Sequence, residues 1–367
     1  MACVPTRSLP ANGGDGLYSY TRNSTFQAKW GVEAAKALIK ESIAEKLDTK
    51  RFVSPLAAST TFCIADLGCS VGPNTFIAVQ NIIESLEVKF SSDGLSSETT
   101  EFQVFFNDFT SNDFNTLFKL IPCDRHYFVA GVPGGFHGRL FPKASIHIIH
   151  CSYALHWLTE VPKEVVDKDS PAWNKGRIDY AYGPPEVHEA YAAQFARDLE
   201  RFLGAREQEL MCGGLMALVV PCLLYGTTAQ QCTLIAMGGV LGSCLIDMAI
   251  EGLLSENDVD SFNLPRYYAS QQELEAVIKR NGSFSIERIE LLDRPKINRG
   301  NITERLSMVT SYFRALLEGL IKEHFGAEIV DGLFDRFEKK IEESSMLSDP
   351  GYKSPGELFI LLKRTVA

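Results

Sequence analysis

The chain has 367 residues, of which 45% are hydrophobic, so it can bury a large core in one or two domains. Its formal net charge of −10 offers no broad basic surface to a nucleic acid or an anionic membrane, and neither partner is expected. The nine cysteines are scattered without the close pairs of a metal site, which favours reduced thiols and a cytoplasmic location.

Two segments bear on export and membrane insertion. The first ten residues contain no apolar run of the secretory-signal kind. The longest apolar stretch, Thr233–Ile250, contains three glycines and Asp247. That composition predicts one buried helix, or two short ones, rather than a membrane span. We therefore expect a soluble protein.

In chain order, the predicted elements begin with a flexible arm over residues 1–24, rich in Gly, Ser, Pro and Tyr. A helix follows, with a stripe of apolar side chains at helical spacing from Val32 to Leu47. Strands and helices then alternate. The predicted strands are Thr61–Asp66, Glu101–Asn107, Tyr127–Val132, Ile146–Cys151, Gly214–Val220, Phe284–Leu291 and Glu357–Leu362.

This alternation predicts one α/β fold. Near-continuous apolar strands such as Ile146–Cys151 are typical of a parallel sheet buried on both faces, with helices as right-handed crossovers. We expect a doubly wound, Rossmann-like sheet with a helical cap, the whole chain 1–367 forming a single catalytic unit. The ranges are about 59–222 and 284–367 for the core, mainly about 223–283 and 300–345 for the cap, and 1–24 for an arm that closes the site.

The turn after the first strand is the strongest local signal. Gly68 and Gly72 allow the backbone to turn sharply and approach a ligand. The turn lacks the third glycine of a dinucleotide fingerprint, and Asp66 would face a phosphate. S-adenosylmethionine carries no phosphate and has an ammonium group that Asp66 can hold, while Asp108 can accept the hydroxyls of its ribose. A nicotinamide-dependent dehydrogenase and a tight turn without ligand remain alternatives.

Several stretches match one family pattern: Gly13–Gln27, Asp66–Asn74, Phe106–Asp108, Gly131–Phe136, Ser152–Leu158, Asn174–Arg177 and Asp260–Pro265. Through them the chain resembles the plant SABATH carboxyl methyltransferases along almost its entire length. This family includes salicylate, benzoate, jasmonate and loganic acid methyltransferases and the N-methyltransferases of the caffeine pathway. In detail the chain is most similar to the loganic acid methyltransferase branch.

The resemblance implies a class I methyltransferase sheet, S-adenosyl-L-methionine as co-substrate, a carboxylic acid as acceptor, and a cytoplasmic homodimer. The implied cofactor contacts are Tyr20, Ser24, Asp66, Cys69, Asn74, Asp108, Phe109, Gly135 and Phe136. The implied substrate contacts are Gln27, Tyr153, His156 and Trp157. Some members hold Mg²⁺ at positions that match Asn174, Asp260, Phe262 and Asn263.

Two of the departures from the family pattern bear on ligand binding. Gly135 stands where a serine is usual, which removes one possible hydroxyl contact to the cofactor. Arg266 replaces a frequent glutamine at the expected pocket rim and suggests a substrate with an extra oxygen or a second charge.

Methylation of a carboxylate needs alignment more than proton transfer. A carboxylic acid with a pKa of roughly 4 is already ionised at neutral pH, so no general base is required. We expect Gln27 and Trp157 to act catalytically by donating N–H groups to one carboxylate oxygen, and His156 to bond a substrate oxygen.

Each role has a structural alternative. Gln27 could complete a capping box with Ser24, Trp157 could be core, and His156 could be a structural histidine. The amide and carboxylate groups of the magnesium set could equally hold loops together.

N-methylation of a xanthine-like heterocycle is the main functional alternative. A xanthine ring would require polar contacts from the cap. The lining expected from the sequence is predominantly apolar, which favours a carboxylic acid: Leu223, Leu224, Tyr225, Met308, Val309 and Tyr312.

Overall fold

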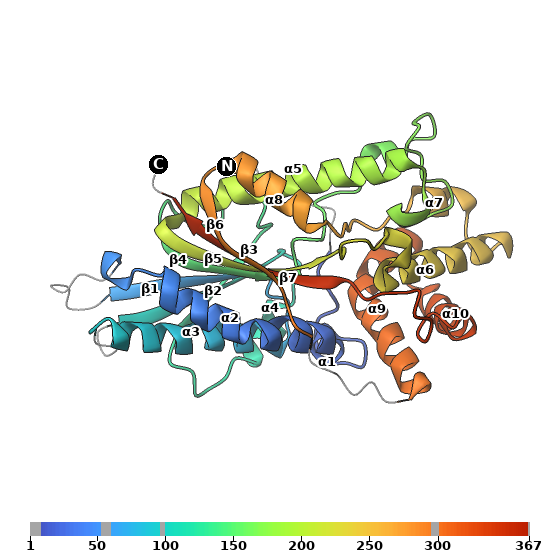
Figure 1. The fold of residues 1–367 in the computed structure, drawn as a ribbon. Helices are drawn as coiled ribbons and strands as arrows, with labels where there is room; N and C mark the ends of the chain where they lie inside the picture. The colour runs from blue at the N-terminus through green and yellow to red at the C-terminus, as the bar shows by residue number, and fades with distance from the viewer. Residues whose placement is uncertain (1–8, 53–59, 96–99, 295–300, 366–367) are drawn as a thin grey trace.

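The computed structural model describes residues 9–52, 60–95, 100–294 and 301–365, so residues 1–8 of the predicted arm lie outside it. All seven predicted strands are present, and they form one sheet in the order β3-β2-β1-β4-β5-β7-β6 (Figure 1). The strands are β1 Thr60–Leu67, β2 Thr100–Asp108, β3 Phe128–Pro133, β4 Ile146–Ser152, β5 Leu210–Cys222, β6 Phe284–Leu291 and β7 Gly356–Arg364.

The strand order places a switch point in the middle of the sheet. From β1 the chain moves outward through β2 to β3, and then returns to β4 on the other side of β1. Strands β1 to β5 pair in parallel, whereas β7 runs antiparallel to both β5 and β6. In open sheets of this kind, ligands bind where the order reverses, outside the carboxyl ends of the strands.

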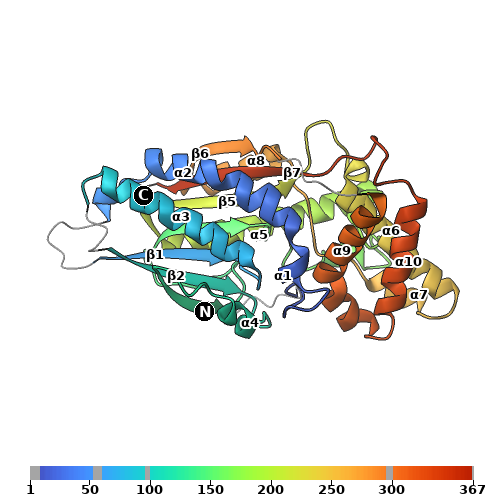
Figure 2. The same ribbon diagram turned by 90° about the horizontal axis from the view of Figure 1, so that it is seen from below.

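Helices cover both faces of the sheet (Figures 1 and 2). One face carries α2 (Ala34–Lys46) and α3 (Pro73–Ser92), and the other carries α5 (Pro185–Glu209) and α8 (Gln271–Asn281). The prediction that α8 belongs to the cap is wrong, because its apolar side chains join the core under α5: Leu274, Val277 and Ile278.

The cap lies beyond the carboxyl ends of the parallel strands (Figure 2). It consists of α6 (Thr233–Ile250), α7 (Glu256–Ser261), α9 (Ile302–Phe325) and α10 (Val330–Glu343). These helices share a hydrophobic core separate from the two cores of the sheet. The cap can therefore shape a cavity against the strand ends without being part of the sheet.

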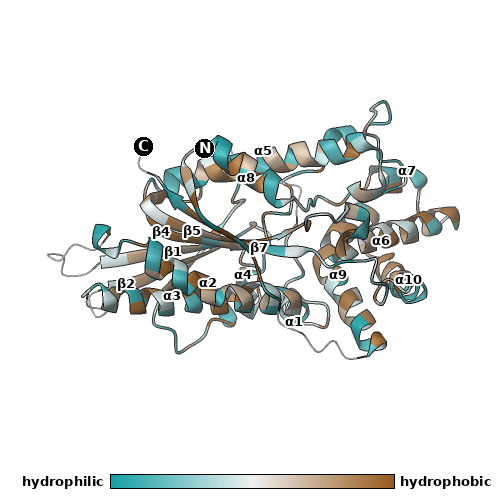
Figure 3. Cartoon of the chain, in the orientation of Figure 1, coloured by the Kyte–Doolittle hydropathy of each residue, from teal (hydrophilic) through white to brown (hydrophobic). Residues whose placement is uncertain are grey.

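Helix α6 is the long apolar segment noted in the sequence, folded as one helix rather than two. By length and composition alone it could cross a membrane, and 50% of it is buried inside the structure. Its buried side chains pack into the cap core, next to α10. Figure 3 shows the same hydrophobic colouring on α6 and on the central strands.

The helix predicted after the arm is divided. A short helix α1 (Tyr20–Asn23) is followed by a π-helical segment, Gln27–Glu33, which leads directly into α2. The remaining short helix, α4, spans Phe114–Lys119. A π-helical turn widens the helix and is frequent at functional sites. Here it contains Gln27 and Trp30, both of which are buried and line the cavities described below.

Candidate active site

The turn after β1 needs glycine for two reasons. Gly68 has a φ of +77°, and a Cβ at this position would lie 2.5 Å from the Cβ of Ala154. A Cβ on Gly72 would lie 3.3 Å from the ring of Tyr20, so this glycine gives that ring room. The turn therefore packs against the arm on one side and against the segment after β4 on the other. These segments would enclose a ligand bound at the turn.

Gly68→Ala is expected to destabilise the protein more than Gly282→Ala and to weaken SAH (S-adenosylhomocysteine) binding, which Gly282→Ala should not change. Both glycines have a left-handed φ, +77° and +74°, so both variants lose about 1–2 kcal/mol. Only Gly68 adds a clash, because nothing lies within 4 Å of a Cβ on Gly282. Thermal unfolding and SAH titration measure the two effects, and equal losses in both variants would contradict the assignment.

Asp66 is held in place by two neighbours. The hydroxyl of Thr75 donates to its Oδ2, and Nδ1 of His150 lies 2.6 Å from its Oδ1. Asp66 is buried but still lines the cavity at the end of β1. Each carboxylate oxygen has a second lone pair, so this arrangement orients Asp66 and leaves it able to accept from an ammonium group. His150 thus positions Asp66.

Asp108 lies at the end of β2 with both oxygens fixed by backbone amides. Ser70 N–H donates to Oδ2 and Phe109 N–H to Oδ1, each at 2.7 Å. Burial raises the pKa of Asp108 to about 6, although these two hydrogen bonds lower it in part. A carboxylate with fixed orientation and unused lone pairs suits the paired hydroxyls of a ribose.

Two adjoining cavities of about 750 and 310 Å³ lie outside the ends of β1, β2 and β4; we call them together the cofactor cleft. The structure brings most of the predicted cofactor residues to its walls: Tyr20, Asp66, Cys69, Asn74, Asp108, Phe109 and Phe136. Ser24 does not line the cleft but holds Asn74, because its hydroxyl accepts a hydrogen bond from Asn74 Nδ2 at 3.0 Å. Gly135 adjoins Phe136 but is not among the lining residues. This donor and acceptor set fits S-adenosylmethionine.

The structure does not form the capping box that was the alternative role of Gln27. Ser24 is bonded to Asn74, and Gln27 Nε2 instead donates to the hydroxyl of Tyr312 at 3.4 Å. Within the described chain, the buried Oε1 of Gln27 has no hydrogen-bond partner. Gln27 lines both parts of the cofactor cleft. Its Oε1 is therefore available to a ligand there.

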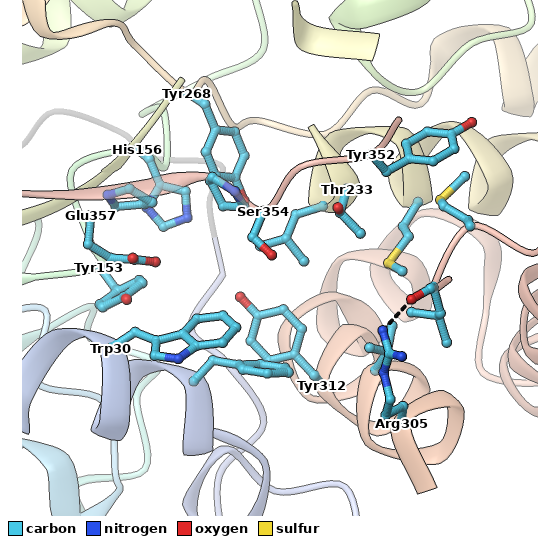
Figure 4. A pocket seen from close by; sticks show the side chains of 18 of the residues that line it. Trp30, Tyr153, His156, Thr233, Tyr268, Arg305, Tyr312, Tyr352, Ser354 and Glu357 are labelled. Atoms are coloured by element: carbon cyan, nitrogen blue, oxygen red, sulfur yellow. Dashed lines mark hydrogen bonds between the residues drawn. The ribbon is translucent and has the colours of Figure 1, made fainter. Parts of the chain in front are cut away.

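A second cavity of about 880 Å³ lies between the sheet and the cap; we call it the acceptor cavity (Figure 4). It shares Tyr153, His156 and Tyr312 with the cofactor cleft, so the two spaces meet at these side chains. A ligand in one can therefore approach a ligand in the other. This contact between a cofactor space and a second space is what a group-transfer reaction requires.

The lining of the acceptor cavity differs from the expected one. Only Val309 and Tyr312 of the six expected residues line it, and Tyr225 is 96% exposed. Apolar groups such as Leu234 and Met237 alternate with polar ones. The polar groups include Thr233, Tyr268, Tyr352, Ser354 and Glu357 (Figure 4). The cavity is mixed rather than predominantly apolar, because the loop before β7 and the start of β7 contribute polar residues from far along the chain.

Tyr153 and His156 form the wall between the two spaces. Tyr153 has a φ of +54°, and Gly31 makes room for its ring, which would otherwise lie 2.4 Å from a Cβ. Burial, with the positive charge of Arg266 as a smaller contribution, lowers the pKa of His156 to about 3. His156 is therefore neutral at physiological pH and a weak proton acceptor, so its role is to form hydrogen bonds.

Trp157 lines the cofactor cleft and not the acceptor cavity. Its ring lies 5.3 Å from that of His156, and it also packs against the cap core. Gln27, from the π-helical segment after the arm, and Trp157, from the segment after β4, thus line the same cleft. Their roles in orienting an acceptor remain predictions.

Arg266 is not at the pocket rim, so that expectation is wrong. It is 4% exposed and bonds to Asp179 Oδ2 and to the carbonyl of Leu234, both at 3.0 Å. A Cβ on Gly238 would lie 2.3 Å from its guanidinium, so α6 has a glycine where this cation passes. Arg266 braces the wall behind the cavity instead of contacting a substrate.

The predicted magnesium residues join loops. Asn174 Nδ2 donates to Asn263 Oδ1 at 2.7 Å, and Asp260 Oδ1 accepts from Gly176 N–H at 2.8 Å. Phe262 packs in the cap core with His324 and Phe325. Among the described residues no group of three or more His, Cys, Asp or Glu side chains could hold a metal. These bonds favour the loop-bracing alternative, and magnesium stays a prediction.

Sequence reasoning missed several lining residues. His137 is buried in the cofactor cleft, and burial lowers its pKa to about 4. Pro10 and Ala11 bring the arm over the cleft, where Asn12 N–H donates to the carbonyl of Ala315 in α9 at 2.8 Å. Glu357 enters the acceptor cavity from β7. His137 directly follows a matched stretch and could have been found; the others carry no local pattern.

Arg206→Met is expected to lower the free energy of unfolding by about 3–5 kcal/mol and to weaken SAH binding. Arg206 is fully buried, bonds to Glu209 at 2.8 Å, and donates to the carbonyls of Phe136 and Gly138 at 2.6 and 2.8 Å. It therefore fixes the loop that lines the cleft. Arg280→Met, which breaks an exposed pair with Glu200, should change neither quantity by much. Denaturant unfolding and SAH titration compare them, and matching losses would refute the role.

A sequence profile described as SAM dependent carboxyl methyltransferase matches residues 6–365. Loganic acid O-methyltransferase of Catharanthus roseus is 45% identical, over 99% of this chain and 97% of that protein. Farnesoic acid carboxyl-O-methyltransferase of Arabidopsis thaliana is 39% identical, over 96% and 97% respectively. The 3,7-dimethylxanthine N-methyltransferase of Camellia sinensis is 37% identical, over 89% of each chain.

Among solved structures, a loganic acid methyltransferase with SAH superposes with a TM-score of 0.90 at 44% identity, covering 97% of this chain and 99% of that one. These similarities confirm the predicted α/β class I methyltransferase fold and the S-adenosylmethionine co-substrate, and they remove the dehydrogenase alternative. With its cofactor cleft next to an acceptor cavity, the chain belongs to the SAM-dependent carboxyl methyltransferase family.

Proposed function

We propose that the enzyme forms the methyl ester of a small acid with a hydroxylated body, and that loganic acid is the first compound to test. The observation that carries this proposal is the acceptor cavity, which meets the cofactor cleft at Tyr153, His156 and Tyr312 and has a mixed lining with several hydroxyl groups. The 45% identity to a loganic acid O-methyltransferase supports it.

In this proposal the protein aligns two reactants and excludes water. S-adenosylmethionine supplies an electrophilic methyl group when bound. Gln27 Nε2 and the indole N–H of Trp157 donate to one carboxylate oxygen, which leaves the other oxygen free to attack. Because the carboxylate is already ionised, the step needs no proton acceptor from the protein. The neutral ester loses the charge-assisted bonds, which promotes its release.

N-methylation of a xanthine remains the second candidate. A relative with that activity is 37% identical, and the polar side chains of the acceptor cavity could also contact a heterocycle. The carboxyl methyltransferase profile and the higher identity of the loganic acid enzyme favour the acid.

A methyl-transfer screen tests the proposal. Purified enzyme with methyl-labelled S-adenosylmethionine is offered loganic acid, farnesoic acid, salicylic acid and xanthine. The proposal predicts a labelled methyl ester that forms fastest with loganic acid. Label on a xanthine nitrogen, with none on the acids, would reject it.

The homodimer, the cytoplasmic location and a bound Mg²⁺ are proposals that rest on the family resemblance. Sedimentation velocity of the purified enzyme, imaging of a tagged chain in plant cells, and turnover before and after removal of divalent cations test them separately.

A further inference from the structure

A buried carboxylate borders the acceptor cavity. Glu357 is the second residue of β7, is 2% exposed, and lines the cavity. Figure 4 shows its side chain between those of His156 and Tyr153, at the end where the acceptor cavity meets the cofactor cleft. Arg305 and Tyr352 lie toward the opposite end. A negative group thus stands close to the place where another negative group, the substrate carboxylate, must react.

Arg294 accounts for only part of the hydrogen-bonding capacity of Glu357. Its Nε and Nη2 donate to the two carboxylate oxygens at 2.5 and 2.7 Å, and its guanidinium lies 4.4 Å from the ring centre of Trp30. An ionised carboxylate accepts about four hydrogen bonds, two on each oxygen. Burial raises the pKa of Glu357, although the ion pair with Arg294 and the nearby hydroxyl of Tyr153 lower it in part. With Tyr153 counted, about one of the four acceptor positions of Glu357 still lacks a donor.

We propose that Glu357 is a specificity-determining residue: it accepts a hydrogen bond from a hydroxyl group of the substrate and repels a carboxylate at that same position. The inference rests on the proposed function, because it takes the cavity as the place of the acid. An acceptor-only group cannot satisfy a second carboxylate, and two like charges in a buried site oppose each other. Glu357 therefore also directs the reacting carboxylate toward Gln27 and Trp157.

The test measures affinities of the SAH-loaded enzyme by calorimetry. The probes are cyclohexanecarboxylate, its 3- and 4-hydroxy derivatives, and the matching 1,3- and 1,4-dicarboxylates. The wild type is expected to bind at least one hydroxy acid about tenfold more tightly than the parent acid, as a hydrogen bond to a charged group gives. It is expected to bind the dicarboxylate of the same geometry more weakly than the parent.

Glu357→Gln should weaken the hydroxyl preference, because its amide oxygen accepts only a neutral hydrogen bond, and should abolish the discrimination against the dicarboxylate, with SAH affinity unchanged. Arg294→Lys is the matched control: it breaks the same two-point ion pair but leaves the carboxylate, so the preference should remain. If both variants lose stability and keep the ratio of affinities, Glu357 is structural and the inference fails. The inference also fails if the wild type shows no hydroxyl preference. If SAH binds but none of the acids does, the proposed function fails first.

Discussion

Trp157→Phe and Gln27→Ala are each expected to lower kcat/KM about 10- to 100-fold, while the affinity for SAH changes little. Each variant removes an N–H donor from the cleft wall, and a hydrogen bond to a carboxylate is worth about 1.5–3 kcal/mol. Trp157→Phe keeps an aromatic ring against His156 and the cap core. A fall in kcat/KM in this variant therefore reports the removal of the indole N–H. Initial rates with the best acid of the methyl-transfer screen, together with SAH titration, measure both effects.

Trp173→Phe is the matched control for Trp157. Its indole lies outside both the cofactor cleft and the acceptor cavity, with Lys175 5.3 Å from the ring centre. This variant is expected to keep the wild-type rate. If Trp157→Phe and Gln27→Ala also kept it, neither side chain would orient the acceptor, and the alignment account of the reaction would be wrong.

Asp108→Ala is expected to weaken SAH binding about a hundredfold or more. The variant removes the carboxylate that would accept two ribose hydroxyls, each bond being charge-assisted. Because the ionised form binds, protonation competes with the ligand. The pKa of about 6 then predicts that wild-type affinity is constant above pH 6 and falls about tenfold for each pH unit below it.

The same raised pKa has the opposite effect on the unliganded protein. A carboxyl whose pKa is higher in the folded state than its ordinary 3.8 contributes less stability as pH rises from that value to about 6.

Asp108→Ala should lose the pH dependence of SAH binding along with the affinity. A variant that kept wild-type affinity at neutral pH would show that this residue does not hold the ribose.

The sheet could be predicted because its strands carry their own signal. Ile146–Ser152 is buried over six of its seven residues, so a run of apolar residues identifies it as a central strand. Helix α8 was misassigned to the cap because its amphipathic pattern fits packing on either a sheet or another helix. The π-helical segment around Gln27 was not predicted, since an apolar stripe looks the same for both helix types over one turn.

The cofactor cleft was largely predictable because its residues cluster where β1 and β2 end. Asp66, Asn74 and Asp108 each lie within a few residues of a strand end, and parallel strands bring these ends together. The lining of the acceptor cavity was not predictable from the sequence, because it combines side chains from α6, α9 and the loop before β7, which lie far apart in the chain. Arg266 and Glu357 show the difficulty: each is one buried charge whose partner, Asp179 or Arg294, is more than 60 residues away.

A crystal structure of the enzyme with SAH and the best acid of the screen tests the central claim most directly. The account predicts the sulfur of SAH in the cofactor cleft and the acid in the acceptor cavity. Its carboxylate should extend past Tyr153 and His156 into the cleft, with one oxygen bonded to Gln27 and Trp157 and the other facing the sulfur. An acid bound elsewhere, or one whose carboxylate points away from the cleft, would contradict the account.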